Sequence, residues 1–270
     1  MSNALKREEP VAIFVCLVLL SSLLLSNFAA AETLYRWVDS DGATRITRSQ
    51  PGLGVAYESL EVPDPVKWFH APDMPGEVAS GSRVTAQDVF RSASASVYAL
   101  TGRNRSGANG AGGIVFGSAV AVTDKLAITN CHILEKAGDE VYLGERGDEP
   151  LERIQLEGAN YEFDRCVVSV SHMDLHPVAG MRRFDALEVG ETVYAIGNPL
   201  RLDRTLSDGL LSAKRVKAER RYLQTTAAIS PGSSGGGLFD ARGNLIGITS
   251  YSLRGAQNIN FAIPAEDFWK

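Results

Sequence analysis

The sequence has only three cysteines among 270 residues, too few to hold a small fold together by disulfides. It also lacks an excess of positive charge. The 27 basic and 32 acidic side chains give a net charge of −5, which argues against a general nucleic-acid-binding protein. With 44% hydrophobic and 22% charged residues, the composition excludes wholesale disorder, collagen and a coiled coil. The chain is long enough for one large domain, or for one domain and a small module.

The longest hydrophobic run lies near the N-terminus, from Val11 to Leu25. Two basic residues precede this run, and three alanines at 29–31 follow it. A basic start, an apolar stretch and an Ala-x-Ala site are typical of a secretory signal peptide. We therefore expect residues 1–31 to be removed and the rest of the chain to be periplasmic or secreted. The alternative is an uncleaved segment that serves as an N-terminal membrane anchor, the only membrane contact that we expect.

Two of the cysteines, Cys131 and Cys166, belong to the exported part of the chain. In an oxidising compartment these two residues could form a disulfide. The sequence is equally compatible with two separate, buried thiols, because it does not give their separation in space.

The exported chain begins with a short unit, residues 32–62. Here Tyr35–Val38 and Ala43–Thr47 alternate polar and apolar residues on either side of an Asp-Gly turn, which predicts a β-hairpin. The pattern resembles a small module of unknown function at the N-termini of exported proteins. Residues 63–83 are rich in proline and glycine, which predicts a linker.

Residues 84–270 contain one short segment with a helical pattern, Thr85–Phe90, in which Thr85 is a candidate cap. After this segment the chain consists of short apolar runs between turn residues. Many short strands without long helical periods indicate an all-β barrel or sandwich. The glycine-rich stretch 101–113 lacks the Gly-Lys-Ser/Thr ending of a phosphate-binding loop, so we expect a mobile loop between strands.

Three residues at distant points of the chain could together perform nucleophilic catalysis. His132 follows an apolar strand, Asp164 precedes another, and Ser234 lies in a glycine-rich turn. A serine hydroxyl becomes nucleophilic when an imidazole removes its proton, and a carboxylate fixes the tautomer of that imidazole. The backbone N–H groups of Gly232 and Ser234 could stabilise the resulting oxyanion.

These residues belong to motifs that follow one another in a characteristic order. The motifs are Gly-Ser-Ala-Val (117–120), Thr-Asn-Cys-His (129–132), Asp-Arg-Cys-Val-Val (164–168), Ala-Ile-Gly-Asn-Pro (195–199), Ser-Pro-Gly-Ser-Ser-Gly-Gly (230–236) and Phe-Ala-Ile-Pro (261–264). Over roughly residues 110–264 the chain resembles the trypsin-like protease domain of the HtrA (Deg) family.

The resemblance implies an all-β fold with a trypsin-like double six-stranded β-barrel and an active site between the barrels. It implies that His132 is the general base, that Asp164 orients it and that Ser234 is the nucleophile. Gly232 and Ser234 match the oxyanion hole.

The chain departs from the family pattern at several positions. Thr226 replaces an acidic residue, while Ser230 and Ser233 replace asparagines, so we expect the substrate cleft to differ in detail from the family pattern although no catalytic group is lost. The sequence ends shortly after Pro264, so we expect the usual peptide-binding PDZ domain to be missing. The oligomeric state stays open.

Four further residues are candidates for substrate binding. Ala228 matches the position at the base of the primary specificity pocket, which favours a modest apolar side chain over Lys or Arg. Thr249, Ser250 and Tyr251 match the edge on which a substrate strand pairs.

Two histidines, His172 and His176, lie four residues apart and could be metal ligands on a helix. The segment follows a strand and runs into Pro177, so we expect a surface loop and no metal site.

Together these features predict a serine endopeptidase that cleaves exposed or unfolded polypeptide through an acyl-enzyme, without a cofactor. One alternative is a weakly active peptide-binding or chaperone-like module on the same fold. Another is an esterase that acts on small acyl substrates.

Overall fold

The structure is a computed structural model, and most of the region after residue 84 is described. The described residues are 32–38, 44–47, 50–62, 74–77, 85–103, 113–137, 140–144, 151–199, 204–253 and 255–269. The predicted signal peptide, the Asp-Gly turn and most of the glycine-rich stretch lie outside these ranges. Within them, no helix has both the length and the apolar character needed to cross a membrane.

The predicted hairpin is part of a three-stranded antiparallel sheet. Its strands are β1 (Glu32–Val38), β2 (Thr44–Thr47) and β3 (Tyr57–Val62), in the order β2-β1-β3. The pairing of β1 with β2 confirms the two predicted strands, and β3 is an addition that the sequence analysis missed. Tyr35 and Tyr57 lie on neighbouring strands with ring centroids 5.4 Å apart, edge to face, a favourable aromatic geometry.

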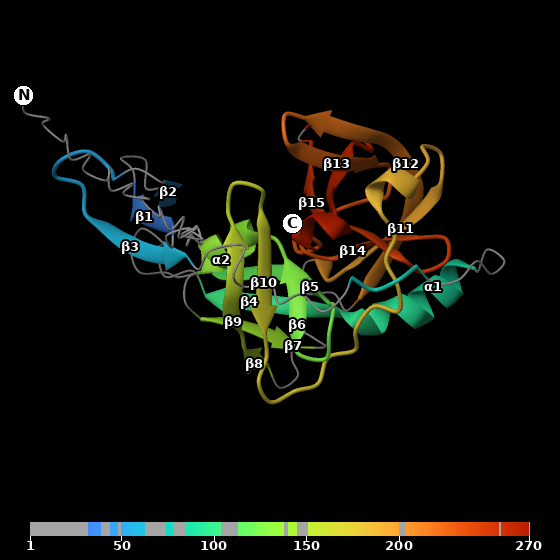
Figure 1. Ribbon diagram of the computed structural model, residues 1–270, viewed down its shortest axis with the longest axis horizontal. Helices are drawn as coiled ribbons and strands as arrows, with labels where there is room; N and C mark the ends of the chain where they lie inside the picture. The colour runs from blue at the N-terminus through green and yellow to red at the C-terminus, as the bar shows by residue number, and fades with distance from the viewer. Residues whose placement is uncertain are drawn as a thin grey trace, which may run out of the picture. The chain divides into compact units, whose positions relative to one another are not determined.

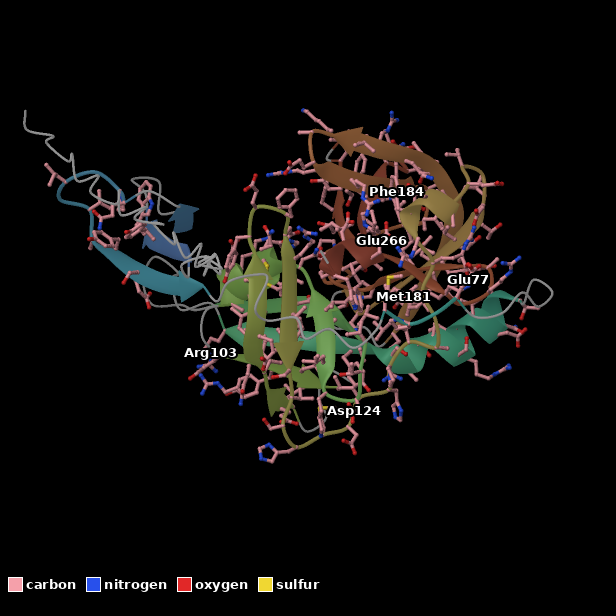
Figure 2. The ribbon with its side chains drawn as sticks, viewed as in Figure 1. Glu77, Arg103, Asp124, Met181, Phe184 and Glu266 are labelled. Atoms are coloured by element: carbon pink, nitrogen blue, oxygen red, sulfur yellow. A yellow bond between two sulfur atoms is a disulfide. The ribbon has the colours of Figure 1, made fainter. Side chains whose placement is uncertain are left out.

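Part of the predicted linker contacts the segment Met181–Arg182. The carbonyl oxygen of Gly76 accepts a hydrogen bond of 3.1 Å from the backbone of Met181. The carboxylate of Glu77 lies 3.6 Å from the guanidinium of Arg182. Figure 2 labels Glu77 and Met181 beside the second barrel.

The predicted helix is confirmed as α1 (Ala86–Ala93), followed by the short η1 (Ser94–Ser96). A capping box begins α1: the Thr85 hydroxyl accepts from the backbone of Asp88, and the Asp88 carboxylate accepts from the backbone of Thr85. The helix buries Val89 and Ala93 against the protein core.

The first sheet of the peptidase-like region is antiparallel, with strand order β8-β7-β4-β5-β6-β10-β9 (Figure 1). Helix α2 (Cys131–Ala137) follows β6. The strands are β4 (Val97–Arg103), β5 (Ile114–Ala121), β6 (Leu126–Thr129), β7 (Val141–Gly144), β8 (Glu152–Arg153), β9 (Gln155–Asn160) and β10 (Arg165–Ser169).

The second sheet closes into a six-stranded barrel in the order β11-β12-β13-β16-β15-β14 (Figure 1). The short η2 (Phe184–Ala186) precedes the barrel, and η4 (Ala265–Trp269) follows it. The strands are β11 (Thr192–Gly197), β12 (Thr205–Lys217), β13 (Arg220–Thr225), β14 (Gly237–Asp240), β15 (Leu245–Ser252) and β16 (Asn260–Pro264). The predicted trypsin-like double barrel is confirmed, although the first sheet has seven strands in open order.

One hydrophobic cluster joins the two sheets. It combines Val120 and Val167 of the first sheet with Ile196, Phe239 and Ile248 of the second, all at most 1% exposed. Because apolar burial is the main source of stability, this shared core fixes the sheets against each other. His132 and Asp164 lie on segments next to strands of the first sheet, and Ser234 lies shortly before β14 of the second.

Candidate active site

His132 and Asp164 are in direct contact. His132 is the second residue of α2, which follows β6 after Asn130, and Asp164 precedes β10. The Nδ1 atom of the imidazole lies 2.9 Å from Oδ2 and 3.1 Å from Oδ1 of the carboxylate. An imidazole next to a carboxylate holds its proton on the facing nitrogen, which leaves Nε2 free to accept one.

Hydrogen bonds from His132 and Ser250 hold the carboxylate of Asp164 in place. The carboxylate accepts a hydrogen bond of 2.9 Å from the backbone N–H of His132, and one of 3.0 Å from the hydroxyl of Ser250. Asp164 has a φ of 57°, in the left-handed region that Asp tolerates better than most residues. The buried amide of Asn130 donates to the carbonyl oxygen of Asp164 at 3.2 Å and supports this turn.

Cys131 and Cys166 form a disulfide, which decides between the two possibilities that the sequence left open. The Sγ atoms are 2.09 Å apart, and the Cα atoms are 5.0 Å apart. Both residues are at most 1% exposed. Cys131 directly precedes His132, and Cys166 lies two residues after Asp164. The disulfide therefore links the two segments that carry the His–Asp pair.

Ser234 lies in the turn between β13 and β14. Its hydroxyl donates a hydrogen bond of 2.7 Å to the carbonyl oxygen of Ser250. Ser250 therefore contacts both Asp164, through its hydroxyl, and Ser234, through its carbonyl. His132 thus contacts Asp164 directly, and Ser250 connects Asp164 to Ser234.

A tight backbone network holds the turn that carries Ser234. The Ser234 carbonyl accepts from the backbone of Ser118 at 2.8 Å, and the Gly235 N–H donates to Thr249 at 2.7 Å. Gly235 has a φ of +84°, and a Cβ atom there would lie 1.9 Å from the carbonyl oxygen of Ser118. Only glycine fits this position, so the glycine of the motif is a steric requirement.

The candidate oxyanion hole belongs to the same turn. Gly232 has a φ of +97°, and its carbonyl oxygen accepts a hydrogen bond of 2.9 Å from the hydroxyl of Ser118. The Ser118 hydroxyl in turn accepts from the backbone N–H of Asn198 at 2.9 Å. Ser118 therefore fixes the peptide between Gly232 and Ser233, just before Ser234. The sequence analysis used Ser118 only as part of a family motif and missed this contact.

The four candidate substrate-binding residues have different environments. Ala228 is exposed, and its backbone N–H donates to the hydroxyl of Ser207 at 2.7 Å. Tyr251 is 42% exposed, and partial burial raises the pKa of its hydroxyl.

The expectation that the backbone of Thr249 is available to pair with a substrate strand needs correction. Its backbone N–H donates to Gly236 and its carbonyl accepts from Gly235, so both groups already serve the turn of Ser234. Thr249 is also 1% exposed, and its hydroxyl donates to the carbonyl of Ser233 at 2.6 Å. Any edge for a substrate strand therefore begins after Thr249.

Glu135 is another carboxylate near the His–Asp pair. It lies on α2, three residues after His132, and is only partly exposed. Burial raises the pKa of Glu135, and the negative charge of Asp164 adds to this increase.

The two histidines considered as metal ligands have other contacts. Nδ1 of His172 lies 3.2 Å from the carboxylate of Glu152, and the backbone of His176 donates to the hydroxyl of Tyr98. Across the described ranges, no group of three or more His, Cys, Asp or Glu side chains is arranged to hold a metal ion.

Much of the peptidase-like region is similar to known proteins. Residues 113–248 match the family model of the trypsin-like peptidase domain. The chain is 37% identical over 156 residues to a putative serine protease, HhoB, of Synechocystis sp., a match that covers 53% of this chain and 36% of HhoB. It is 34% identical over 150 residues to a probable periplasmic serine endoprotease, DegP-like, of Pseudomonas savastanoi, covering 53% and 31% of the two chains. The chain thus spans about a third of the length of these relatives.

Solved structures show the same fold. The HtrA-type protease AlgW with a tripeptide superposes with a TM-score of 0.61 and 30% identity, over 69% of this chain and 62% of that chain. A serine endoprotease from Yersinia pestis superposes with a TM-score of 0.56 and 26% identity, over 68% and 64% of the two chains.

Proposed function

The chain belongs to the trypsin-like peptidase family, and from this premise we propose that it is a serine endopeptidase that hydrolyses exposed or unfolded polypeptide. The observation that carries the proposal is the contact of the His132 Nδ1 atom with the carboxylate of Asp164 at 2.9 Å. This contact prepares Nε2 to accept the proton of a serine. The hydroxyl of Ser234 is connected to the same carboxylate through Ser250.

In the proposed reaction, the Ser234 hydroxyl turns from the carbonyl of Ser250 toward Nε2 of His132. His132 removes its proton while Oγ attacks the carbonyl carbon of the substrate, and the N–H groups of Gly232 and Ser234 stabilise the oxyanion. His132 then gives the proton to the leaving amine, which breaks the C–N bond and leaves an ester on Ser234. A water molecule, deprotonated by His132, attacks that ester; the bond to Ser234 Oγ breaks, His132 returns the proton to Oγ, and the acid is released.

The substrate is proposed to bind as an extended strand beside β15. Beyond Thr249, the strand continues through Ser250 and Tyr251 to Ser252, whose hydroxyl donates to the carbonyl of Ile229 at 3.3 Å. Main-chain pairing at a strand edge accepts many sequences and therefore suits unfolded polypeptide. The solved AlgW structure contains a bound tripeptide, which supports a peptide substrate.

We further propose that the peptidase domain spans residues 84–270, that residues 32–62 form a separate module and that the protein is exported to the periplasm. The N-terminal sequence pattern and the disulfide both fit an oxidising compartment. The DegP-like relative is described as periplasmic, which supports the same location. Fractionation of cells that express the full chain tests this part of the proposal.

The catalytic proposal is tested by labelling with a fluorophosphonate probe, which reacts with activated serines. We expect labelling of the native protein and of Ser233→Ala, and none of Ser234→Ala. Ser233→Ala is the matched control because it removes the neighbouring hydroxyl, which lies 8% exposed in the same turn. Cleavage of casein by the native protein, without comparable turnover of a short acyl ester, then separates a peptidase from an esterase.

One observation favours the second candidate function, a weakly active peptide-binding module. The Ser234 hydroxyl donates to Ser250, so its proton is directed away from the imidazole at rest. A protein that binds unfolded casein but stays unlabelled, even with casein present, would support the binding module and contradict the peptidase.

A further inference from the structure

A basic ribbon, residues 213–222, extends from the second barrel. Strand β12 pairs with β11 only as far as Leu210, and β13 pairs with β16 only from Leu223 onward. In the described ladders, residues 213–222 pair only between β12 and β13, with Ala213 opposite Gln224 and Lys214 opposite Leu223 at the base of the ribbon (Figure 1). The ribbon has five basic residues and one acidic residue, whereas the whole chain has a net charge of −5.

One face of the basic ribbon packs on the protein. The Lys214 ammonium lies 4.8 Å from the ring centre of Phe184, and the Arg221 guanidinium lies 4.7 Å from the same centre. Arg221 also pairs with the carboxylates of Glu266, at 2.7 Å, and Asp267. The charges on this face are therefore used to anchor the ribbon.

The opposite face carries Arg215, Lys217 and Arg220 together with Tyr222. Side chains of directly opposed residues share a face, and the register pairs Arg215 with Tyr222 and Lys217 with Arg220. Like charges in direct opposition destabilise a strand pair, so local stability does not explain this arrangement. The Arg215 guanidinium donates to the neutral amide of Gln224. Within the described part of the chain, neither Arg215 nor Lys217 is ion-paired with a carboxylate.

This basic face adjoins the candidate active site. The Arg220 guanidinium lies 5.6 Å from the ring centre of Phe163, the residue before Asp164. The Tyr222 ring lies 5.9 Å from the ring of Tyr251, the residue after Ser250. A cavity of about 230 Å³ is lined by Arg220 and Tyr222 of this face together with Phe163, Arg165 and the acidic residues Glu219 and Asp267.

We propose that this basic face is an exosite that binds an acidic segment of the polypeptide being cleaved. The inference rests on the proposed peptidase function and adds a preference that the catalytic residues do not supply. A substrate strand antiparallel to β15 would place residues on the N-terminal side of the scissile bond beside Tyr251, and an acidic segment further upstream would reach the ribbon. This position beside the candidate site favours a segment of the substrate over a separate nucleic acid or a membrane.

The test uses two unfolded substrates with the same cleavage sequence, preceded by four glutamates in one and four glutamines in the other. The measured quantity is the ratio of their kcat/KM values, in which any general loss of activity cancels. We expect the native protein to prefer the glutamate substrate and Arg215→Glu/Lys217→Glu to lower the ratio by about fivefold or more. Since exposed charges are screened by salt, the native ratio should fall between about 50 mM and 500 mM NaCl.

The control, Arg103→Glu/Arg153→Glu, changes the total charge equally on the first sheet, and Arg103 lies far from the second barrel (Figure 2). We expect the control to keep the native ratio. An equal fall in both double variants would overturn the exosite, because it would indicate an effect of total charge.

A second measurement separates failure of the exosite from failure of the peptidase. Fluorescence anisotropy of the labelled peptides with Ser234→Ala reports binding without cleavage, and we expect tighter binding of the glutamate peptide. Equal binding of both peptides overturns the exosite, whether or not the native protein cleaves them. The basic face would be assigned to a membrane instead if the native protein bound anionic vesicles, Arg215→Glu/Lys217→Glu did not, and both peptides were bound and cleaved equally.

Discussion

The carbonyl oxygen of Ser250 accepts the hydroxyl proton of Ser234 at 2.7 Å, while the Ser250 hydroxyl donates to Asp164 at 3.0 Å. One residue thus contacts the candidate nucleophile and the carboxylate that orients the candidate base. The carbonyl of Ser250 holds the Ser234 hydroxyl in its resting direction, and the hydroxyl of Ser250 helps to hold the carboxylate of Asp164 in place. These two roles can be separated by mutation, because a substitution removes only the side chain.

Ser250→Ala should lower kcat/KM for a peptide substrate by about tenfold. It deletes a hydrogen bond to a charged group, worth about 1.5–3 kcal/mol, but leaves the two His132 contacts to the carboxylate. Steady-state kinetics provide the measurement. The control is Ser252→Ala, which removes a neighbouring hydroxyl that contacts a neutral carbonyl at 3.3 Å. Equal kinetics for the two variants would show that the Ser250 hydroxyl does not help to position the catalytic pair.

Gly235→Ala and Gly243→Ala form a matched pair that tests the turn of Ser234. Both residues have nearly the same φ, +84° and +83°, in the region that favours glycine. Alanine in this region costs about 1–2 kcal/mol at either position. At 235 the new Cβ would also lie 1.9 Å from the Ser118 carbonyl oxygen, whereas at 243 it would lie 3.3 Å from the Ser92 hydroxyl.

We therefore expect Gly243→Ala to be only modestly less stable and to keep fluorophosphonate labelling. Gly235→Ala should lose labelling even at temperatures where circular dichroism shows a folded protein. Normal labelling of folded Gly235→Ala would mean that the turn can move without displacing Ser234.

Several features could be predicted from the sequence because their signals are local. Thr85 and Asp88 lie three residues apart, the spacing of a capping box, so the start of α1 is visible in the sequence. The order of the motifs around His132, Asp164 and Ser234 likewise points to one site, although the distances between the residues come only from the structure.

Other features depend on contacts between distant segments and have no local signal. Ser118 supports the candidate oxyanion hole across 114 residues of sequence. The backbone N–H and carbonyl of Thr249 form hydrogen bonds with the turn that carries Ser234. The alternation of polar and apolar residues along a strand does not reveal such contacts. Strand β3 was missed because its polar residues obscure the pattern and its partner β1 is not adjacent in sequence. The disulfide was left open for a related reason, because pairing of two cysteines depends on their separation in space.

Removal of the disulfide should reduce stability much more than catalysis. The cysteines are 35 residues apart, and closing a loop of that size stabilises the fold by about 3–4 kcal/mol in the chain-entropy model. Cys131→Ala/Cys166→Ala should therefore unfold at lower urea concentration. The backbone N–H and the imidazole of His132 both keep their hydrogen bonds to the Asp164 carboxylate. The value of kcat at 25 °C should therefore change little.

Urea denaturation followed by fluorescence, together with kinetics on the same samples, tests this expectation. Native protein denatured and refolded under reducing conditions is the control, since it lacks the bond but keeps both sulfur atoms. A large fall in kcat in a fully folded double variant would show that the disulfide positions the His–Asp pair.

Glu135→Gln should stabilise the protein at neutral pH. Burial raises the pKa of Glu135 above its ordinary value, with Asp164 adding to the effect, so the folded state binds a proton more readily than the unfolded state. Folding therefore carries a penalty at pH values above the elevated pKa, where the carboxylate is ionised. The penalty shrinks as the pH falls through that pKa, and it vanishes below the pKa of the unfolded chain. Glutamine keeps the shape without the charge, so the advantage of the variant should follow the same course.

Urea unfolding of native protein and Glu135→Gln between about pH 4 and pH 8 measures this difference. The control is Glu140→Gln, which neutralises a carboxylate in the same part of the chain but outside helix α2. A gain for Glu135→Gln that stays constant across the pH range would indicate a packing or helix-propensity effect. A loss at neutral pH would mean that the attraction between Glu135 and the neighbouring ammonium of Lys136 outweighs the cost of its burial beside Asp164.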